Sequence, residues 1–114
     1  MYKQGTVILV PFPFTDLSSK KVRPAIIVSE NLSGDDVVAV FISSHTAKNL
    51  QKTEIFLKKA DRNFGNTGLK SDPVVKVSKI ATLDKEIILG ELGFVSDEVL
   101  IEIQRRLKIV FGIR

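Results

Sequence analysis

Short apolar runs separated by polar turns make up most of the chain before residue 96. The run Thr6-Val7-Ile8-Leu9-Val10 is largely β-branched, and Pro11 and Pro13 then remove backbone donors, so a first strand is expected there. Four more runs predict strands, over residues 24–29, 37–42, 53–57 and 74–80. The run over residues 37–42 is almost continuously apolar, which is typical of a strand buried on both faces. Residues 74–80 alternate between apolar and polar, which predicts a strand with one face exposed to solvent.

The pattern changes to a helical period from Ser96 onward. Ser96 is a typical cap, Asp97 and Glu98 fill the first turn, and Gly112 follows the last turn. The apolar positions of this helix are residues 99, 100, 103, 107, 110 and 111. Residues 63–72 are expected to form a loop, and residues 83–94 are either a short strand pair or a helical turn broken at Gly90 and Gly93.

Five or more short strands followed by one amphipathic helix predict a mainly β fold with α, as a small curled sheet or barrel packed by the helix. With 114 residues, the chain is expected to form a single domain over residues 1–114. Apolar runs stay well below the ~20 residues that span a bilayer, and the N-terminus does not resemble a signal peptide. A cytoplasmic protein without a membrane partner is therefore expected.

Cysteine and histidine usage limits the chemistry. The chain has no cysteine and one histidine, His45, which excludes a disulfide framework and a typical zinc centre. Phosphate-binding glycine loops, nucleophile elbows and metalloprotease motifs are missing from the sequence as well. We therefore expect any catalysis to proceed without a metal or cofactor.

The basic excess suggests a polyanion as a partner. Lys and Arg number 17 against 13 Asp and Glu, for a net charge of +4. The surplus lies in residues 1–31 and 45–86, whereas residues 87–114 are balanced. Residues 11–22 combine aromatic residues, turn formers and cations in a long loop, and such loops are often functional.

Hydroxyl groups and cations are what a chain needs to promote cleavage of RNA, whose own 2′-OH attacks the adjacent phosphate. Arg23, held by Pro24, is placed to bind a phosphate, although its position alone favours an ordinary exposed arginine at a strand end. Ser43 and Ser44 follow an apolar strand, where serine is also ordinary turn chemistry. His45 is a natural proton shuttle near neutral pH, or simply an exposed loop residue.

Two further pairs of side chains are candidates for contacts with RNA. Lys76 and Lys79 lie three residues apart on one strand, so ideal alternation points at most one of them into a given groove. Phe12 and Phe14 face the same way if the segment is extended, and either could stack on bases or close the core. We expect one of the two phenylalanines to belong to the core.

The sequence resembles the MazF/PemK (Kid) family of toxins from type II toxin–antitoxin systems. The resemblance rests on five segments, which are residues 5–17, 23–29, 40–44 and 79–84 and the ending from Gly93 to Gly112. Arg23-Pro24 followed by the apolar strand is its strongest part.

The resemblance implies a homodimer of SH3-like β-barrels with small helices. It further implies a metal-independent, sequence-selective endoribonuclease that cuts single-stranded RNA, commonly mRNA, and leaves a 2′,3′-cyclic phosphate and a 5′-hydroxyl. A cognate antitoxin would block the site. The family's principal catalytic pair falls on Arg23 and Ser43, the latter in place of a threonine. The residues expected to bind RNA are Lys21, Ser44, Lys76, Lys79 and Phe14.

Two departures from the family pattern concern acid–base chemistry. Leu17 stands where some members have a loop histidine, and Lys76 and Ser78 stand where they have an Arg-x-Asp pair. The proton acceptor is therefore open among Asp16, His45 and Arg23 itself. Two non-catalytic alternatives follow, namely a protein similar to the Ccd-type gyrase poisons and a plain SH3-like nucleic-acid-binding module.

Overall fold

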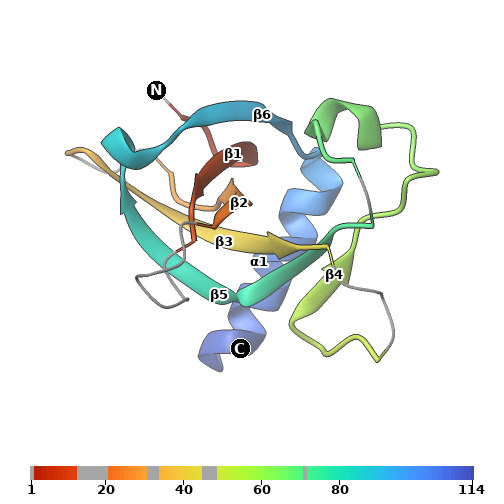
Figure 1. Ribbon diagram of the computed structural model, residues 1–114. Coiled ribbons are helices and arrows are strands. Elements are labelled where there is room, and N and C mark those ends of the chain that lie inside the picture. The colour runs from red at the N-terminus through yellow and green to blue at the C-terminus, as the bar shows by residue number, and fades with distance from the viewer. Residues whose placement is uncertain (1, 13–20, 31–33, 45–48, 71) are drawn as a thin grey trace.

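Six antiparallel strands form one sheet in the order β4-β5-β3-β2-β1-β6 (Figure 1). The computed structural model describes residues 2–12, 21–30, 34–44, 49–70 and 72–114. The strands are β1 (Thr6–Pro11), β2 (Val22–Ile27), β3 (Asp36–Ser43), β4 (Glu54–Phe56), β5 (Val74–Asp84) and β6 (Gly90–Phe94). The helices are the 3-10 turns η1 (Phe64–Thr67) and η2 (Lys85–Ile87) and the α-helix α1 (Asp97–Phe111).

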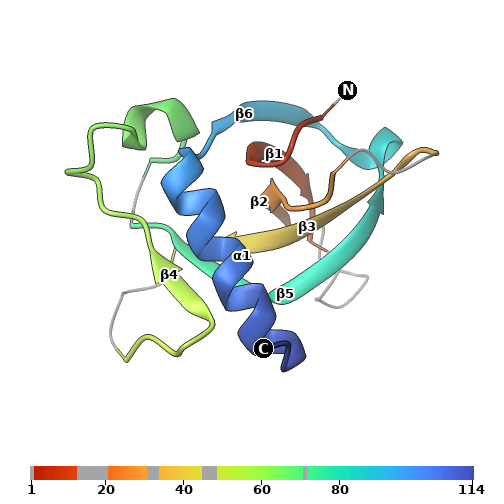
Figure 2. The ribbon, with the colours of Figure 1, turned by 180° about the vertical axis from the view of Figure 1, so that it is seen from behind.

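The sheet curls around the molecule, and β4 and β6 form its two edges (Figure 1). Among the described residues these edge strands do not pair with each other, so the barrel-like sheet stays open. The helix α1 crosses one face of the sheet (Figure 2). The predicted mainly β fold with a C-terminal helix is therefore confirmed.

Apolar side chains fill both faces of the sheet, as the continuous run in β3 predicted. One group, here called the helix-side core, comprises Val7, Ile26, Val40, Ile42, Leu57, Val75, Val77, Val95 and Ile103. The other, here called the second core, comprises Ile8, Val10, Ala25, Ile27, Val37, Ala39, Phe41 and Leu83. Successive strand residues alternate between the two groups, since side chains of a strand point to opposite faces.

The helix begins and ends where the sequence predicts. The Ser96 hydroxyl accepts a hydrogen bond from the backbone N–H of Val99 at 3.2 Å, and Gly112 closes the helix at φ 66°. Ile103 is completely buried in the helix-side core. Phe111, one of the apolar positions of the helical pattern, is nevertheless 62% exposed, because the last helical turn extends past β5 (Figure 2).

Three segments differ from the sequence-based expectation. Strand β2 covers Val22–Ile27 rather than residues 24–29, because the pairing with β1 continues to Pro11 opposite Val22. Strand β5 continues to Asp84, and the ambiguous region then contains η2 and β6. The expected loop over residues 63–72 contains η1, which lies against β6. Gly68 and Gly93 permit this approach, because a Cβ on either would collide with the backbone of Leu92 or Asn66. Within the described part of the chain, no helix has the length and apolar character needed to cross a membrane.

Candidate functional site

The strand registers bring polar side chains from β2 and β5 to the face of the second core. Arg23 of β2 pairs with Val10 of β1, and Lys76 of β5 pairs with Phe41 of β3. Directly paired residues of antiparallel strands point to the same face. Since Val10 and Phe41 both belong to the second core, Arg23 and Lys76 project from that same face, at the end of the sheet.

These side chains surround a hollow of about 310 Å³, here called the cationic hollow. Its lining residues are Phe12, Lys21, Arg23, Phe41, Ile42, Ser43, Ser44, Lys76 and Lys79. Four of them are cations, two are serines, and none of the described lining residues is acidic. A hollow of this composition favours an anionic ligand, because the cations supply charge and the serines supply hydrogen-bond donors.

Arg23 stands at the wall of the cationic hollow and is half-buried. Its guanidinium carbon lies 5.9 Å from the centre of the Phe12 ring, which is within the range of a cation–π contact. The Phe12 ring packs edge-on against Phe41, with ring centres 5.2 Å apart. The backbone N–H of Phe12 donates to the carbonyl of Lys21 at 2.8 Å. Phe12 therefore packs against the second core and supports Arg23 at the same time.

Ser43 approaches Arg23 from the end of β3. The last pair of the β2–β3 ladder is Ala25 with Phe41, and extending that register by two residues puts Arg23 opposite Ser43. Ser43 is half-buried and Ser44 is exposed. A guanidinium and a hydroxyl from separate strands thus line one hollow.

A second hollow of about 160 Å³, here called the side hollow, adjoins the first. Arg23, Ser43 and Ser44 line both hollows. The rest of the side hollow is lined mainly by apolar side chains, such as Leu69, with Lys70 as one further cation. Arg23 and Ser43 consequently belong to the lining of both spaces, of which the cationic hollow has four cations and the side hollow two.

Lys76 and Lys79 line the same hollow, so the prediction that at most one of them would face any groove was wrong. Between Val40 and Phe41 the partner on β5 moves from Ile80 to Lys76, which leaves residues 77–79 as a bulge. Simple alternation does not hold across a bulge, where the strand bends and side chains are redirected. The bulge therefore brings a second lysine to the hollow.

Glu54 is a charged residue beside the site that the sequence analysis did not consider. It pairs with Lys76 across β4 and β5, and its carboxylate accepts a hydrogen bond from the Lys76 ammonium at 2.8 Å. This bond, followed by one from the backbone N–H of Gln51, lowers the pKa of Glu54 below its ordinary value of 4.5, although burial opposes the shift. The contact between Glu54 and Lys76 depends on the pairing of the three-residue strand β4 with β5. The pattern of apolar and polar residues in the sequence gives no signal for this pairing.

Three predicted site residues, Asp16, His45 and Phe14, lie outside the described residues. Of the other expected RNA contacts, Lys21, Ser44, Lys76 and Lys79 all line the cationic hollow. In the described part of the chain, no three His, Asp or Glu side chains gather as a metal site requires.

A separate hollow of about 190 Å³ lies beside the start of α1. It is lined by Lys58 and Arg62 but also by Asp61 and Glu98, so opposite charges are mixed there. Such a lining gives no net preference for an anion. The cationic hollow is therefore the better candidate for a functional site.

Comparison with known proteins gives a consistent result. Residues 3–111 match the family model described as PemK-like, MazF-like toxin of type II toxin–antitoxin system. A search by sequence among curated proteins found no significant match.

Similar folds occur among solved structures. An endoribonuclease in complex with its cognate antitoxin from a mycobacterial species has a TM-score of 0.78 at 22% identity, covering 100% of this chain and 98% of that one. A chain of the MazE–MazF complex from Deinococcus radiodurans has a TM-score of 0.73 at 20% identity, covering 99% and 97%. The Mycobacterium tuberculosis toxin MazF-mt6 has a TM-score of 0.73 at 13% identity, covering 96% and 98%. At these identities the likeness establishes the fold.

Proposed function

The chain belongs to the family of PemK-like, MazF-like toxins of type II toxin–antitoxin systems, and we propose that it is an endoribonuclease that cuts single-stranded RNA, mRNA included. The observation that supports this most directly is the cationic hollow, where four cations and two serine hydroxyls face one space. Two solved structures of similar fold are described as endoribonucleases. Cleavage of mRNA would stop translation and growth.

In the proposed reaction the ribose 2′-OH attacks the adjacent phosphorus. The bond to the 5′-oxygen of the next nucleotide breaks, which leaves a 2′,3′-cyclic phosphate and a 5′-hydroxyl. Arg23 binds the scissile phosphate through its planar fork, and Ser43 donates a hydrogen bond to a phosphate oxygen. Both donors stabilise the charge that accumulates on the phosphate in the transition state.

The remaining cations hold the strand rather than the reacting atoms. Lys21, Lys76 and Lys79 line the cationic hollow together with Arg23 and Ser43, and in the proposed complex they contact the phosphates that flank the scissile one. The side hollow, which Arg23 and Ser43 also line, would receive the neighbouring nucleotide. Phosphate contacts carry no sequence information, so base choice comes from the loops at residues 11–22 and 44–53.

One residue must accept the 2′-OH proton, and another must donate a proton to the leaving 5′-oxygen. Arg23 takes part in proton transfer, with Asp16 and His45 as the other candidates. We expect Asp16→Asn and His45→Ala to separate these assignments: the variant that removes the acceptor slows single-turnover cleavage without weakening RNA binding. If neither variant slows cleavage, the role falls to Arg23.

We further propose two protein partners. The described residues include large exposed apolar side chains on β6 and α1, among them Phe94, Ile101 and Phe111, which a second copy of the chain in a homodimer can cover.

The cationic hollow suits an acidic segment of a cognate antitoxin, which would compete with RNA for the same cations. We expect the antitoxin to displace a labelled RNA from the protein. Added salt should weaken this competition.

The decisive experiment is RNA cleavage in EDTA by the wild-type protein, Arg23→Ala and Ser43→Ala. A long single-stranded transcript serves as substrate, and primer extension locates the cuts. We expect the wild-type protein to cut at a limited set of sites and each variant to be slower by about 100-fold or more. Undiminished cutting by both variants would remove the site assignment.

One observation favours a non-catalytic function of the gyrase-poison type. The described lining residues of the cationic hollow include no carboxylate and no imidazole, so none of these residues is a conventional base for proton transfer. A purified protein that leaves the transcript intact, yet binds gyrase, would establish this second function. Salt-sensitive RNA binding without products would instead establish a plain nucleic-acid-binding module.

A further inference from the structure

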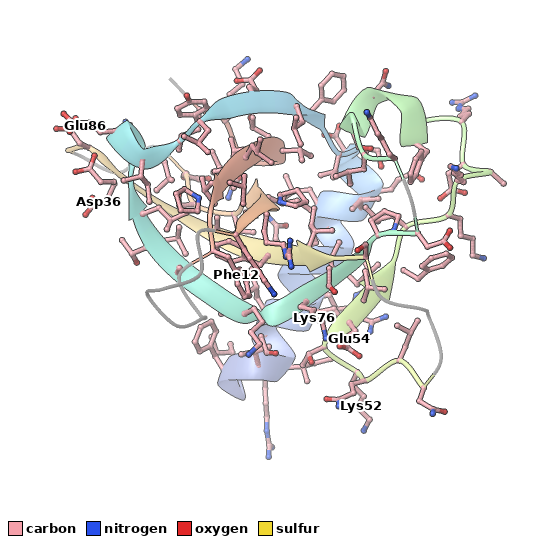
Figure 3. All side chains as sticks on the ribbon, viewed as in Figure 1. Phe12, Asp36, Lys52, Glu54, Lys76 and Glu86 are labelled. Carbon is pink, nitrogen blue, oxygen red and sulfur yellow. The ribbon has the colours of Figure 1, made fainter. Side chains whose placement is uncertain are left out.

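The contact between Glu54 and Lys76 joins an edge strand to the cationic hollow (Figure 3). The Lys76 ammonium donates to Glu54 Oε2 at 2.8 Å, and the two side chains are 32% and 16% exposed. Lys76 lines the cationic hollow, whereas Glu54 does not. The carboxylate therefore lies beside the lysine on the edge strand, outside the lining of the cationic hollow.

Hydrogen bonds fix both the carboxylate and the backbone of Glu54. Its second carboxylate oxygen accepts a hydrogen bond from the backbone N–H of Gln51 at 2.9 Å, and its own backbone N–H donates to the carbonyl of Gln51 at 3.0 Å. Each carboxylate oxygen thus has a donor of its own. A carboxylate held in this way is a rigid anchor for the flexible lysine side chain.

The C-terminal helix braces the short strand that carries Glu54. Arg106 of α1 donates from Nη1 to the carbonyl of Lys52 at 2.6 Å and to the carbonyl of Glu54 at 3.3 Å. The same guanidinium donates from Nε to Glu102 at 2.7 Å, which fixes its orientation on the helix. A continuous chain of contacts therefore runs from α1 through β4 to Lys76.

We propose that Glu54 is a positioning residue, which holds the Lys76 ammonium at the wall of the cationic hollow so that it can bind an RNA phosphate. An ammonium has three N–H donors, and the bond to Glu54 uses one, so two are left for phosphate oxygens. The anchor reduces the conformational freedom that Lys76 would otherwise lose when it binds RNA. This inference rests on the proposed RNA-binding function of the hollow.

The test measures binding to a labelled single-stranded RNA pool of random sequence with 2′-O-methyl groups, which cannot undergo 2′-OH attack. Glu54→Gln keeps the shape of the side chain but removes its charge, and we expect binding about fivefold weaker than wild type. The slope of log affinity against log salt should become shallower by up to about 0.7, since one phosphate contact is weakened.

A double-mutant cycle separates positioning from general damage to the fold. In a Lys76→Met background, Glu54→Gln should have no further effect on binding, because the lysine that Glu54 positions is gone. Glu86→Gln is the matched control: Glu86 is exposed in η2, far from Glu54 across the molecule (Figure 3). It removes the same charge, and we expect its affinity and salt slope to match those of wild type.

Tighter or unchanged binding by Glu54→Gln would overturn the inference, because Glu54 would then compete with RNA for Lys76 or be irrelevant to it. A loss of equal size with and without Lys76 would also overturn it. Failure of the proposed nuclease function has a different signature. In that case the wild-type protein leaves a natural transcript intact, while the coupling between Glu54 and Lys76 persists in binding.

Discussion

The two faces of the curled sheet contain similar apolar side chains but differ in what lies next to them. The helix-side core is covered by α1, whose residue Ile103 is completely buried there. The second core has no α-helix over it in the described structure, and at one end of the sheet its face continues into the cationic hollow. One face therefore provides mainly stability, whereas the other supports the polar site.

This difference explains how so short a chain carries a charged site. Arg23 and Lys76 pair with the core residues Val10 and Phe41, so their backbones are fixed by the same ladders that build the second core. Only their polar ends reach the hollow. The site is thus rigid at its base, which is what a preorganised set of hydrogen-bond donors requires.

The largest expected effect is on the helix side. Ile103→Ala leaves a cavity in the helix-side core and should reduce the free energy of unfolding by about 2–5 kcal/mol. Urea denaturation measures this loss. Cleavage per folded molecule should stay near wild type, so a selective loss of activity with unchanged stability would contradict the division between the two faces.

Arg23→Lys should reduce cleavage and leave stability almost unchanged, which is the opposite of the result expected for Ile103→Ala. The charge remains, but the planar fork that binds two phosphate oxygens is lost, and we expect cleavage to slow by about 100-fold. The free energy of unfolding should change by less than about 0.5 kcal/mol, as is usual for side chains outside a core. Single-turnover cleavage and urea denaturation of the same preparation test both statements.

The next comparison is between two exposed lysines, one at the cationic hollow and one on the helix α1, which are replaced in the variants Lys79→Met and Lys108→Met. Lys79 lines the cationic hollow, whereas Lys108 lies in the last turn of α1. Loss of one phosphate contact should make the salt slope of RNA binding shallower by about 0.7 for Lys79→Met. The slope for Lys108→Met should match wild type, and equal changes in both variants would mean that binding follows net charge alone.

Glu54→Gln should have a small effect on stability, with a defined pH dependence. The Glu54 pKa is lowered in the folded protein, so its ionised form stabilises the fold above the ordinary value of 4.5, and this contribution is lost as the pH falls through the folded pKa. We expect wild type to exceed the variant by about 0.5 kcal/mol at neutral pH. The difference should shrink in acid, and a difference independent of pH would show that the ion pair is not its source.

Much of the fold was predictable because its signals are local. Periodicity located all the strands before residue 80, and the Ser96 cap and Gly112 located the helix. The segment after residue 83 was less clear, because glycine and apolar residues there fit two structures equally well. The exposed position of Phe111 depends on where the sheet ends beneath the helix, which no local pattern encodes.

The candidate site was predictable in part. Arg23 and Ser43 were chosen from sequence, and both line the cationic hollow. Lys79 was misjudged, because the bulge opposite Val40 and Phe41 changes the direction of its side chain. Glu54 was missed, because it meets Lys76 only through the pairing of β4 with β5.

The sequence alone determined the order of strands and helix, the positions of the helix ends and the location of the basic excess, because each depends on neighbouring residues. Only the tertiary structure decided which strands pair, in which register and with which bulge. A shift of one residue in register moves a side chain to the opposite face of a sheet. That is why the contact between Lys76 and Glu54, and the approach of Lys79 to the cationic hollow, are evident only in the folded chain.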